Sequence, residues 1–193
     1  MFSLIRNLRD RSIDHLREWL NAADNRTWNK KREQLVNDLA ACGKDFRIMG
    51  PFALHAPSMI EIGNNVHIGE NSFIRGEGGL TIGDNTVISR NLVLYTINHR
   101  YEGTRLPYDQ ELEHQPVVIG RNVWIGMNVC IAPGTTIGDG AIIALGAVVS
   151  GIINPGEIVG AQRFRVLKNR NREHYQQLDE QRLYADPWGR PLE

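Results

Sequence analysis

The sequence has few cysteines and no long apolar run, and each absence excludes a class of protein. Two cysteines among 193 residues cannot build the disulfide framework of a small secreted domain. No apolar run approaches the roughly 18 residues that a membrane-spanning helix needs. The N-terminus lacks an apolar core followed by a small-residue cleavage site. We therefore expect a cytoplasmic protein.

The sequence also lacks an excess of charge of either sign. Lys and Arg together number 22, Asp and Glu together number 22, and the formal net charge is +0. A general nucleic-acid binder needs a surplus of positive charge to offset the phosphates. We therefore expect no nucleic-acid partner, and the length favours one domain with terminal appendages.

What the sequence does contain is a branched aliphatic residue at every sixth position over much of its length. In the clearest stretch, residues 119–150, Gly, Ala or Ser follows each of them, and a small or medium residue stands four positions after it. A helix has a period of about 3.6 and a strand a period of about 2, so a period of six indicates a solenoid of stacked repeats. The units begin at Ile62, Ile68, Ile74, Ile82, Ile88, Leu94, Ile119, Ile125, Ile131, Ile137, Ile143 and Val149.

Six residues suffice for a short strand and a tight turn, so three units would complete one turn of a flat-sided coil. The aliphatic residues would fill a triangular prism, with adjacent coils about 4.8 Å apart. Glycines and asparagines would occupy the corners, because they tolerate positive φ. The asparagines concerned are Asn64, Asn65, Asn85, Asn122 and Asn128. The predicted fold class is an all-β solenoid, a parallel β-helix over residues 46–161.

An insertion over residues 100–118 interrupts this repeat with prolines and many charged residues. A long loop that leaves a rigid repeat is usually functional. Residues 1–45 are predicted to be helical, with Leu35, Val36 and Leu39 inward, and to cap the open end of the coil. A basic amphipathic helix on a membrane surface is the alternative, but acidic residues on its polar face favour the cap. Residues 162–193 are predicted to form a basic segment with a short helix and a tail.

His99 is the leading candidate for a catalytic residue. It ends a repeat unit and opens the insertion, so its ring can lie beside a groove. Acyl transfer to an alcohol needs a base that titrates near neutral pH, and histidine does so without much tuning. An exposed loop histidine is the alternative interpretation. His114, in the insertion beside Glu111 and Glu113, could also line the site, although a solvated loop histidine is favoured; the remaining histidines lack a motif.

The array from about residue 48 to residue 170 resembles the hexapeptide-repeat acyltransferases, which fold as left-handed parallel β-helices. Within that superfamily, Tyr95–Gly103 and Gln115–Gly126 look most like segments of sugar O-acetyltransferases. The resemblance implies acetyl-CoA as the donor, no required metal, and a homotrimer with sites between neighbouring prisms. It also implies that His99 is the general base for direct attack by an acceptor hydroxyl.

The same resemblance implies two groups of binding residues. Those toward the acceptor are Arg75, Glu77, Tyr95 and Asn98, although Arg75 and Glu77 could also be a surface ion pair of little energetic value. Those toward acetyl-CoA are Trp124, Met127, Leu145, Ser150, Gly151, Arg165 and Lys168. A tryptophan at a repeat corner is too large for the prism interior, so Trp124 should point outward.

The sequence departs from the family pattern at three places. The family usually has Ala at position 145, Thr-Lys at 150–151 and Asn-Pro-Ala-Lys where residues 162–165 read Gln-Arg-Phe-Arg. The missing lysine removes one cation for the phosphates of CoA, while Arg165 and Lys168 keep two. We expect CoA binding to be retained in a weaker or different pose.

Three functions stay open, and the first is favoured. The chain could acetylate a hydroxyl of a sugar or a polysaccharide precursor, with the acceptor unidentified and an amine also conceivable. It could be a zinc enzyme resembling γ-class carbonic anhydrases, but these need three histidines on neighbouring coils and the repeat has only His67 and His99. It could be a non-catalytic scaffold in glycan assembly, which Leu145 and Gly151 suggest.

Overall fold

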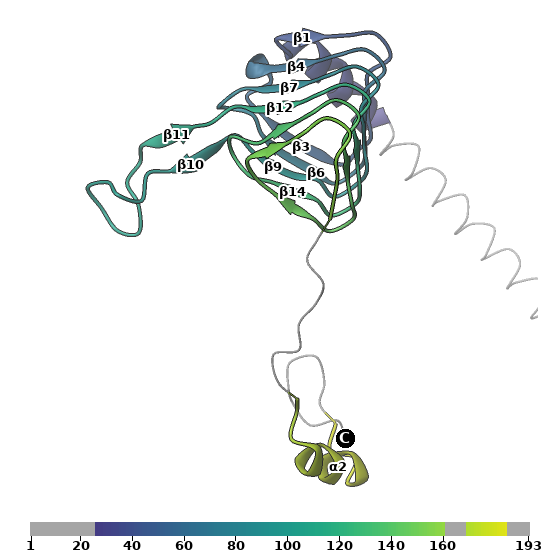
Figure 1. Cartoon of the computed structure of the whole chain (residues 1–193), viewed down its shortest axis with the longest axis vertical. Coiled ribbons are helices and arrows are strands. Elements are labelled where there is room, and N and C mark those ends of the chain that lie inside the picture. Colours follow the sequence, from purple (N-terminus) through teal and green to yellow (C-terminus); the bar gives the residue numbers. More distant parts are fainter. Residues whose placement is uncertain (1–25, 161–168, 185–193) are drawn as a thin grey trace, which may run out of the picture. The chain divides into compact units, whose positions relative to one another are not determined.

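The computed structural model of the protein describes residues 26–160 and 169–184. The chain divides into two compact units, Met1–Ala161 and Gln162–Glu193. The first unit is a parallel β-solenoid with three flat sides, as the repeat predicted (Figure 1). Within the described ranges, no helix is long and apolar enough to cross a membrane.

Each side of the solenoid is a parallel sheet, and successive strands along the chain visit the three sides in turn. The first side contains β1 (Ala41–Cys42), β4 (Ile60–Ile62), β7 (Leu80–Ile82), β12 (Val117–Ile119), β15 (Thr136–Ile137) and β18 (Ile152–Ile153). The second side contains β2 (Arg47–Ile48), β5 (His67–Ile68), β8 (Val87–Ile88), β13 (Trp124–Ile125), β16 (Ile142–Ile143) and β19 (Ile158–Val159). The third side contains β3 (Phe52–His55), β6 (Ser72–Arg75), β9 (Val93–Tyr95), β14 (Cys130–Ile131) and β17 (Val148–Val149). A short 3-10 helix, η1 (Pro57–Met59), precedes β4.

The aliphatic residue of each repeat unit points into the prism, which explains the period of six. Ile88, Ile125 and Ile143 are partners in one ladder and are each 0% exposed. The residue four positions after the aliphatic one is also buried, as Val129 and Ala141 show. Burial of this continuous column of apolar side chains stabilises the coil, because the hydrophobic effect scales with the apolar area removed from water.

The asparagines at the corners adopt positive φ, with one exception. The Nδ2 of Asn65 donates to the Oδ1 of Asn85 in the next coil at 3.1 Å, so the corner side chains also form ladders. Asn64 is the exception and does not have positive φ. Its backbone N–H and its Nδ2 both donate to Oδ1 of Asp84 in the next coil. The predicted corner residues with positive φ are Asn65, Asn85, Asn122 and Asn128.

Residues 26–38 form a helix beside the first coil. Leu35 and, just beyond the helix, Leu39 join the hydrophobic core, and Nη1 of Arg32 donates to the carbonyl of Ile48 at 3.0 Å. The prediction for Val36 was wrong: it is 41% exposed, because it directly follows Leu35 and therefore lies about 100° away from it around the helix, outside the inner face. The first coil begins at β1, within the segment assigned to the cap, and residues 1–25 of that segment lie outside the described residues.

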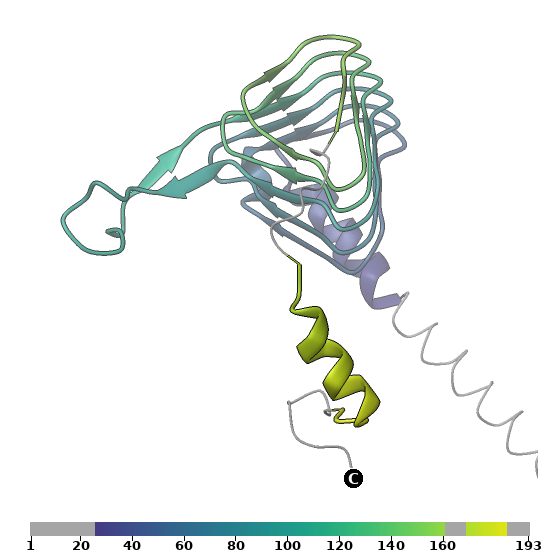
Figure 2. The ribbon, with the colours of Figure 1, turned by 60° about the horizontal axis from the view of Figure 1, so that its bottom comes forward.

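The insertion is an antiparallel hairpin that projects from the prism between β9 and β12 (Figures 1 and 2). Its strands are β10 (Ile97–His99) and β11 (Leu112–His114), with His99 opposite Leu112. The excursion therefore begins at residue 97 rather than 100, and the solenoid resumes at Val117. In the second unit, α2 (Arg172–Glu180) begins with Asn171, whose side chain accepts from the backbone N–H of His174.

Candidate functional site

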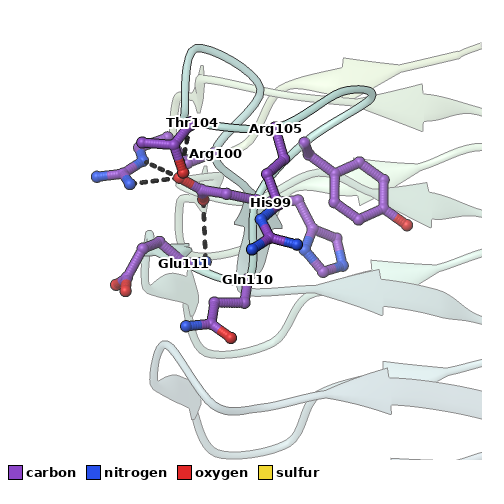
Figure 3. A pocket seen from close by; sticks show the side chains of 8 residues that line it. His99, Arg100, Thr104, Arg105, Gln110 and Glu111 are labelled. Atoms are coloured by element: carbon purple, nitrogen blue, oxygen red, sulfur yellow. Dashed lines mark hydrogen bonds and ion pairs between the residues drawn. The ribbon is translucent and has the colours of Figure 1, made fainter.

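The hairpin carries a cavity of about 520 Å³ near its tip. His99, the last residue of β10, and residues of the loop that connects β10 to β11 line it (Figure 3). They are His99, Arg100, Thr104, Arg105, Tyr108, Asp109, Gln110 and Glu111. The groove that the sequence analysis expected beside His99 is therefore a cavity formed by the insertion itself.

His99 lies at the wall of this cavity with its imidazole stacked on Tyr108. The two ring centroids are 4.0 Å apart and the planes differ by 19°. The side-chain oxygen of Asn98 accepts from the backbone N–H of His99 at 2.9 Å. The stack fixes the plane of the imidazole, the residue is exposed, and neither ring nitrogen hydrogen-bonds to another described residue.

Asp109 organises the tip of the hairpin, and the sequence analysis did not identify it. Its side chain is 5% exposed and forms an ion pair with Arg100, whose Nε and Nη2 both donate to Oδ2. The backbone N–H of Thr104 donates to Oδ2 at 3.1 Å, and that of Glu111 donates to Oδ1 at 3.0 Å. The hydrogen bond from Arg100 lowers the pKa of the Asp109 carboxyl, so the group remains ionised.

Glycine at position 103 is required by the same arrangement. A Cβ atom there would lie 2.1 Å from Oδ2 of Asp109. The ion pair between Arg100 and Asp109 could not be predicted from sequence, because many arginines and aspartates in a charged insertion are about nine positions apart without forming a contact. The glycine was the one local signal of a close approach.

Arg75, Glu77 and Tyr95, which the sequence analysis assigned to the acceptor, lie together on the third side and its adjoining corner. Arg75 pairs with Tyr95 across β6 and β9, and its Nε donates to Oε1 of Glu77 at 2.7 Å. The side chains of Arg75 and Glu77 are 31% and 25% exposed, so the pair is half-buried rather than fully solvated. Oε2 of Glu77 is buried and has no hydrogen-bond donor among the described residues.

Thr96 joins this group to the root of the hairpin. It is 0% exposed, and its Oγ1 donates to the carbonyl of Arg75 and accepts from the backbone N–H of Gly78, both at 2.7 Å. Because Thr96 immediately precedes β10, it fixes the point from which Asn98 and His99 leave the prism.

The described residues assigned to acetyl-CoA fall into two groups on different parts of the prism. Trp124 lies on β13 of the second side, where it points outward as expected and is 55% exposed. Met127 and Leu145 lie at the adjoining corner, between the second and third sides, and are 38% and 60% exposed. Ser150 and Gly151 occupy the corner between the third and first sides, from which the hairpin departs. One copy of the chain therefore brings Ser150 and Gly151 to the hairpin corner but not the other three.

Arg165 and Lys168 lie outside the described residues. Among the residues that are described, no group of three or more His, Cys, Asp and Glu side chains could hold a metal ion. The two cysteines are free.

Comparisons with known proteins match the repeat array. The family described as "Bacterial transferase hexapeptide (six repeats)" matches residues 116–151, and "Hexapeptide repeat of succinyl-transferase" matches residues 59–96. The galactoside O-acetyltransferase of Escherichia coli is 34% identical over 96 residues, which are 49% of this chain and 47% of that protein. The chain spans about half the length of the curated relatives it matches.

Solved structures show the same architecture over more of the chain. A hexapeptide-repeat-containing acetyltransferase of Vibrio cholerae in complex with acetyl-CoA has a TM-score of 0.64 and 28% identity, covering 72% of this chain and 76% of that one. A galactoside acetyltransferase in complex with CoA has a TM-score of 0.62 and 28% identity, covering 86% of this chain and 78% of that one.

Proposed function

We propose that this chain is a hexapeptide-repeat acetyltransferase that transfers the acetyl group of acetyl-CoA to a hydroxyl of a sugar or a polysaccharide precursor. The observation that carries the proposal is the position of His99 at the wall of the hairpin cavity, with its ring held against Tyr108. The similar galactoside O-acetyltransferase and the structures with acetyl-CoA or CoA support the donor and the class of acceptor.

In this mechanism the imidazole of His99 removes the proton of the acceptor hydroxyl as its oxygen attacks the thioester carbonyl. A carbon–oxygen bond forms, and the tetrahedral intermediate then collapses with cleavage of the carbon–sulfur bond. The imidazolium returns the proton to the departing CoA thiolate, which leaves as the free thiol. No covalent acyl-enzyme forms, because the acceptor attacks the donor directly.

We also propose that a second copy of the chain completes each site in a homotrimer. The separation of Trp124, Met127 and Leu145 from the hairpin corner supports this arrangement, since one prism cannot present both groups to the same ligand. The exposure of these three apolar side chains supports it as well, because clustered apolar surface favours an interface or a ligand.

The first experiment measures thiol release from acetyl-CoA across a panel of sugars and nucleotide sugars. His99→Gln should lower the rate by about 10²- to 10⁴-fold, the range typical of a lost general base. The matched control is His114→Gln, because His114 is an exposed histidine on the paired strand of the same hairpin and does not line the cavity. Equal rates for His99→Gln and the wild type would contradict the base assignment.

Two further results separate the alternatives. Absence of thiol release with every acceptor, together with absence of CoA binding by calorimetry, would favour the non-catalytic scaffold. If the trimer model holds, mixing His99→Gln with Trp124→Ala at low acetyl-CoA concentration should give more activity than either variant gives alone, because one mixed interface then contains both native residues. Failure of mixed trimers to recover any activity would contradict a shared site.

A further inference from the structure

Of the two arginines that line the hairpin cavity, one has no ion-pair partner among the described residues. Arg100 and Asp109 neutralise one another in a hydrogen-bonded ion pair. Glu111 contributes its backbone N–H to Asp109, and Figure 3 shows its carboxylate on the side of the cavity away from His99. Arg105 has no carboxylate within ion-pair distance among the residues that the structure describes.

The guanidinium of Arg105 points toward the imidazole of His99, where the proposed reaction takes place (Figure 3). Figure 3 shows the side chain of Arg105 extending into the cavity toward the imidazole of His99. An acceptor whose hydroxyl contacts His99 would therefore place its neighbouring substituents next to Arg105. A guanidinium donates two parallel hydrogen bonds to a carboxylate or a phosphate, which is a stronger and more specific contact than a hydroxyl can offer.

We propose that the acceptor is an anionic sugar derivative, whose phosphate or carboxylate is bound by Arg105 while a nearby hydroxyl is acetylated. This inference rests on the proposed function and narrows its substrate class. In this arrangement Arg105 is a specificity-determining residue, and Asp109 keeps Arg100 from competing for the same anion. Neutral sugars would still reach His99 but would bind without the ion pair.

The test compares matched acceptors, each neutral sugar being paired with its sugar phosphate and its uronic acid. The sugar phosphate and the uronic acid should each show a lower KM than the neutral sugar. Comparison of the KM values of these two anionic acceptors identifies which anion is preferred. Arg105→Gln should raise the KM for the anionic acceptor by about 10- to 100-fold, as expected for lost charge-assisted hydrogen bonds. The KM for acetyl-CoA and the rate with the neutral sugar should not change.

Two further variants and a change of salt concentration test whether the KM change in Arg105→Gln comes from the lost charge interaction. Arg105→Lys keeps the charge without the planar fork and should show an intermediate KM. Arg121→Gln removes an exposed arginine from the corner between the first and second sides, which carries none of the proposed binding residues, and should leave acceptor kinetics unchanged. Added salt should raise the KM for the anionic acceptor in the wild type and not in Arg105→Gln, because salt screens the charge interaction.

The two proposals fail in different ways. Equal kcat/KM for neutral and anionic acceptors, unchanged in Arg105→Gln, would overturn the anionic acceptor while His99-dependent transfer remained. Absence of His99-dependent transfer to any member of the panel, neutral or anionic, would overturn the proposed function itself.

Discussion

Thr96→Val removes one oxygen atom at the junction between the prism and the hairpin. Valine has nearly the shape of threonine, so packing at this fully buried position is retained. The carbonyl of Arg75 keeps a donor, the backbone N–H of Thr96 at 2.9 Å, but the N–H of Gly78 loses its acceptor. Leaving a fully buried donor unsatisfied costs about 1–3 kcal/mol; because Gly78 is half-buried, the free energy of unfolding should fall by about 1 kcal/mol, the low end of that range.

Urea unfolding at a fixed protein concentration measures this loss, and amide hydrogen exchange locates it. The amide of Gly78 should exchange faster in Thr96→Val than in the wild type, while amides of the distant coils keep their protection. The matched control is Thr96→Ser, which keeps the hydroxyl and removes one methyl group, at a cost of roughly 0.8 kcal/mol with normal Gly78 exchange. Unchanged stability and unchanged exchange in Thr96→Val would refute the argument that this hydroxyl holds the junction.

Three further predictions follow from neighbouring contacts. Ile125→Ala should cost about 2–5 kcal/mol in urea unfolding because a fully buried side chain is lost, whereas Trp124→Ala should preserve stability and raise the KM for acetyl-CoA; the reverse pattern would contradict the inward and outward assignments. Because the folded pKa of Asp109 is lowered, its stabilising effect is complete above the unfolded carboxyl pKa of about 4 and is lost as the pH falls through the folded value. The stability difference between the wild type and Asp109→Asn, measured from pH 7 to pH 3, should therefore shrink only at the acidic end, and a constant difference would contradict it. Gly103→Ala should lower kcat/KM with little change in the unfolding of the prism, while Gly160→Ala, whose added Cβ meets only an ordinary contact at 3.5 Å, should change neither.

The repeat could be predicted from sequence because its physical cause is local. An inward aliphatic residue every sixth position, such as Ile125 and Ile131, is required by a coil that turns three times per circuit. The same pattern predicted that Trp124 points outward. The prediction for Val36 failed because the inner face of the helix had to be chosen from a short apolar cluster, without knowing where the helix packs on the coil.

The hairpin cavity could not be predicted, since its contacts join residues that no periodic pattern relates. Asp109 is buried because Arg100, Thr104 and Glu111 are brought around it by the turn. The direction of Arg105 toward His99 has the same origin. The role of His99 as a base stays a prediction that kinetics must test.

The sequence by itself determined the solenoid, the place where it is interrupted and the histidine at that interruption, because short-range periodicity sets all three. Only the tertiary structure decided which of the proposed binding residues meet. It placed Ser150 and Gly151 at the hairpin corner and Trp124 on another side, because the side on which a residue lies depends on which strand of the three-strand circuit it belongs to or follows. It also decided that Arg105 remains unpaired among the described residues, because the nearest acidic groups are either occupied or directed away.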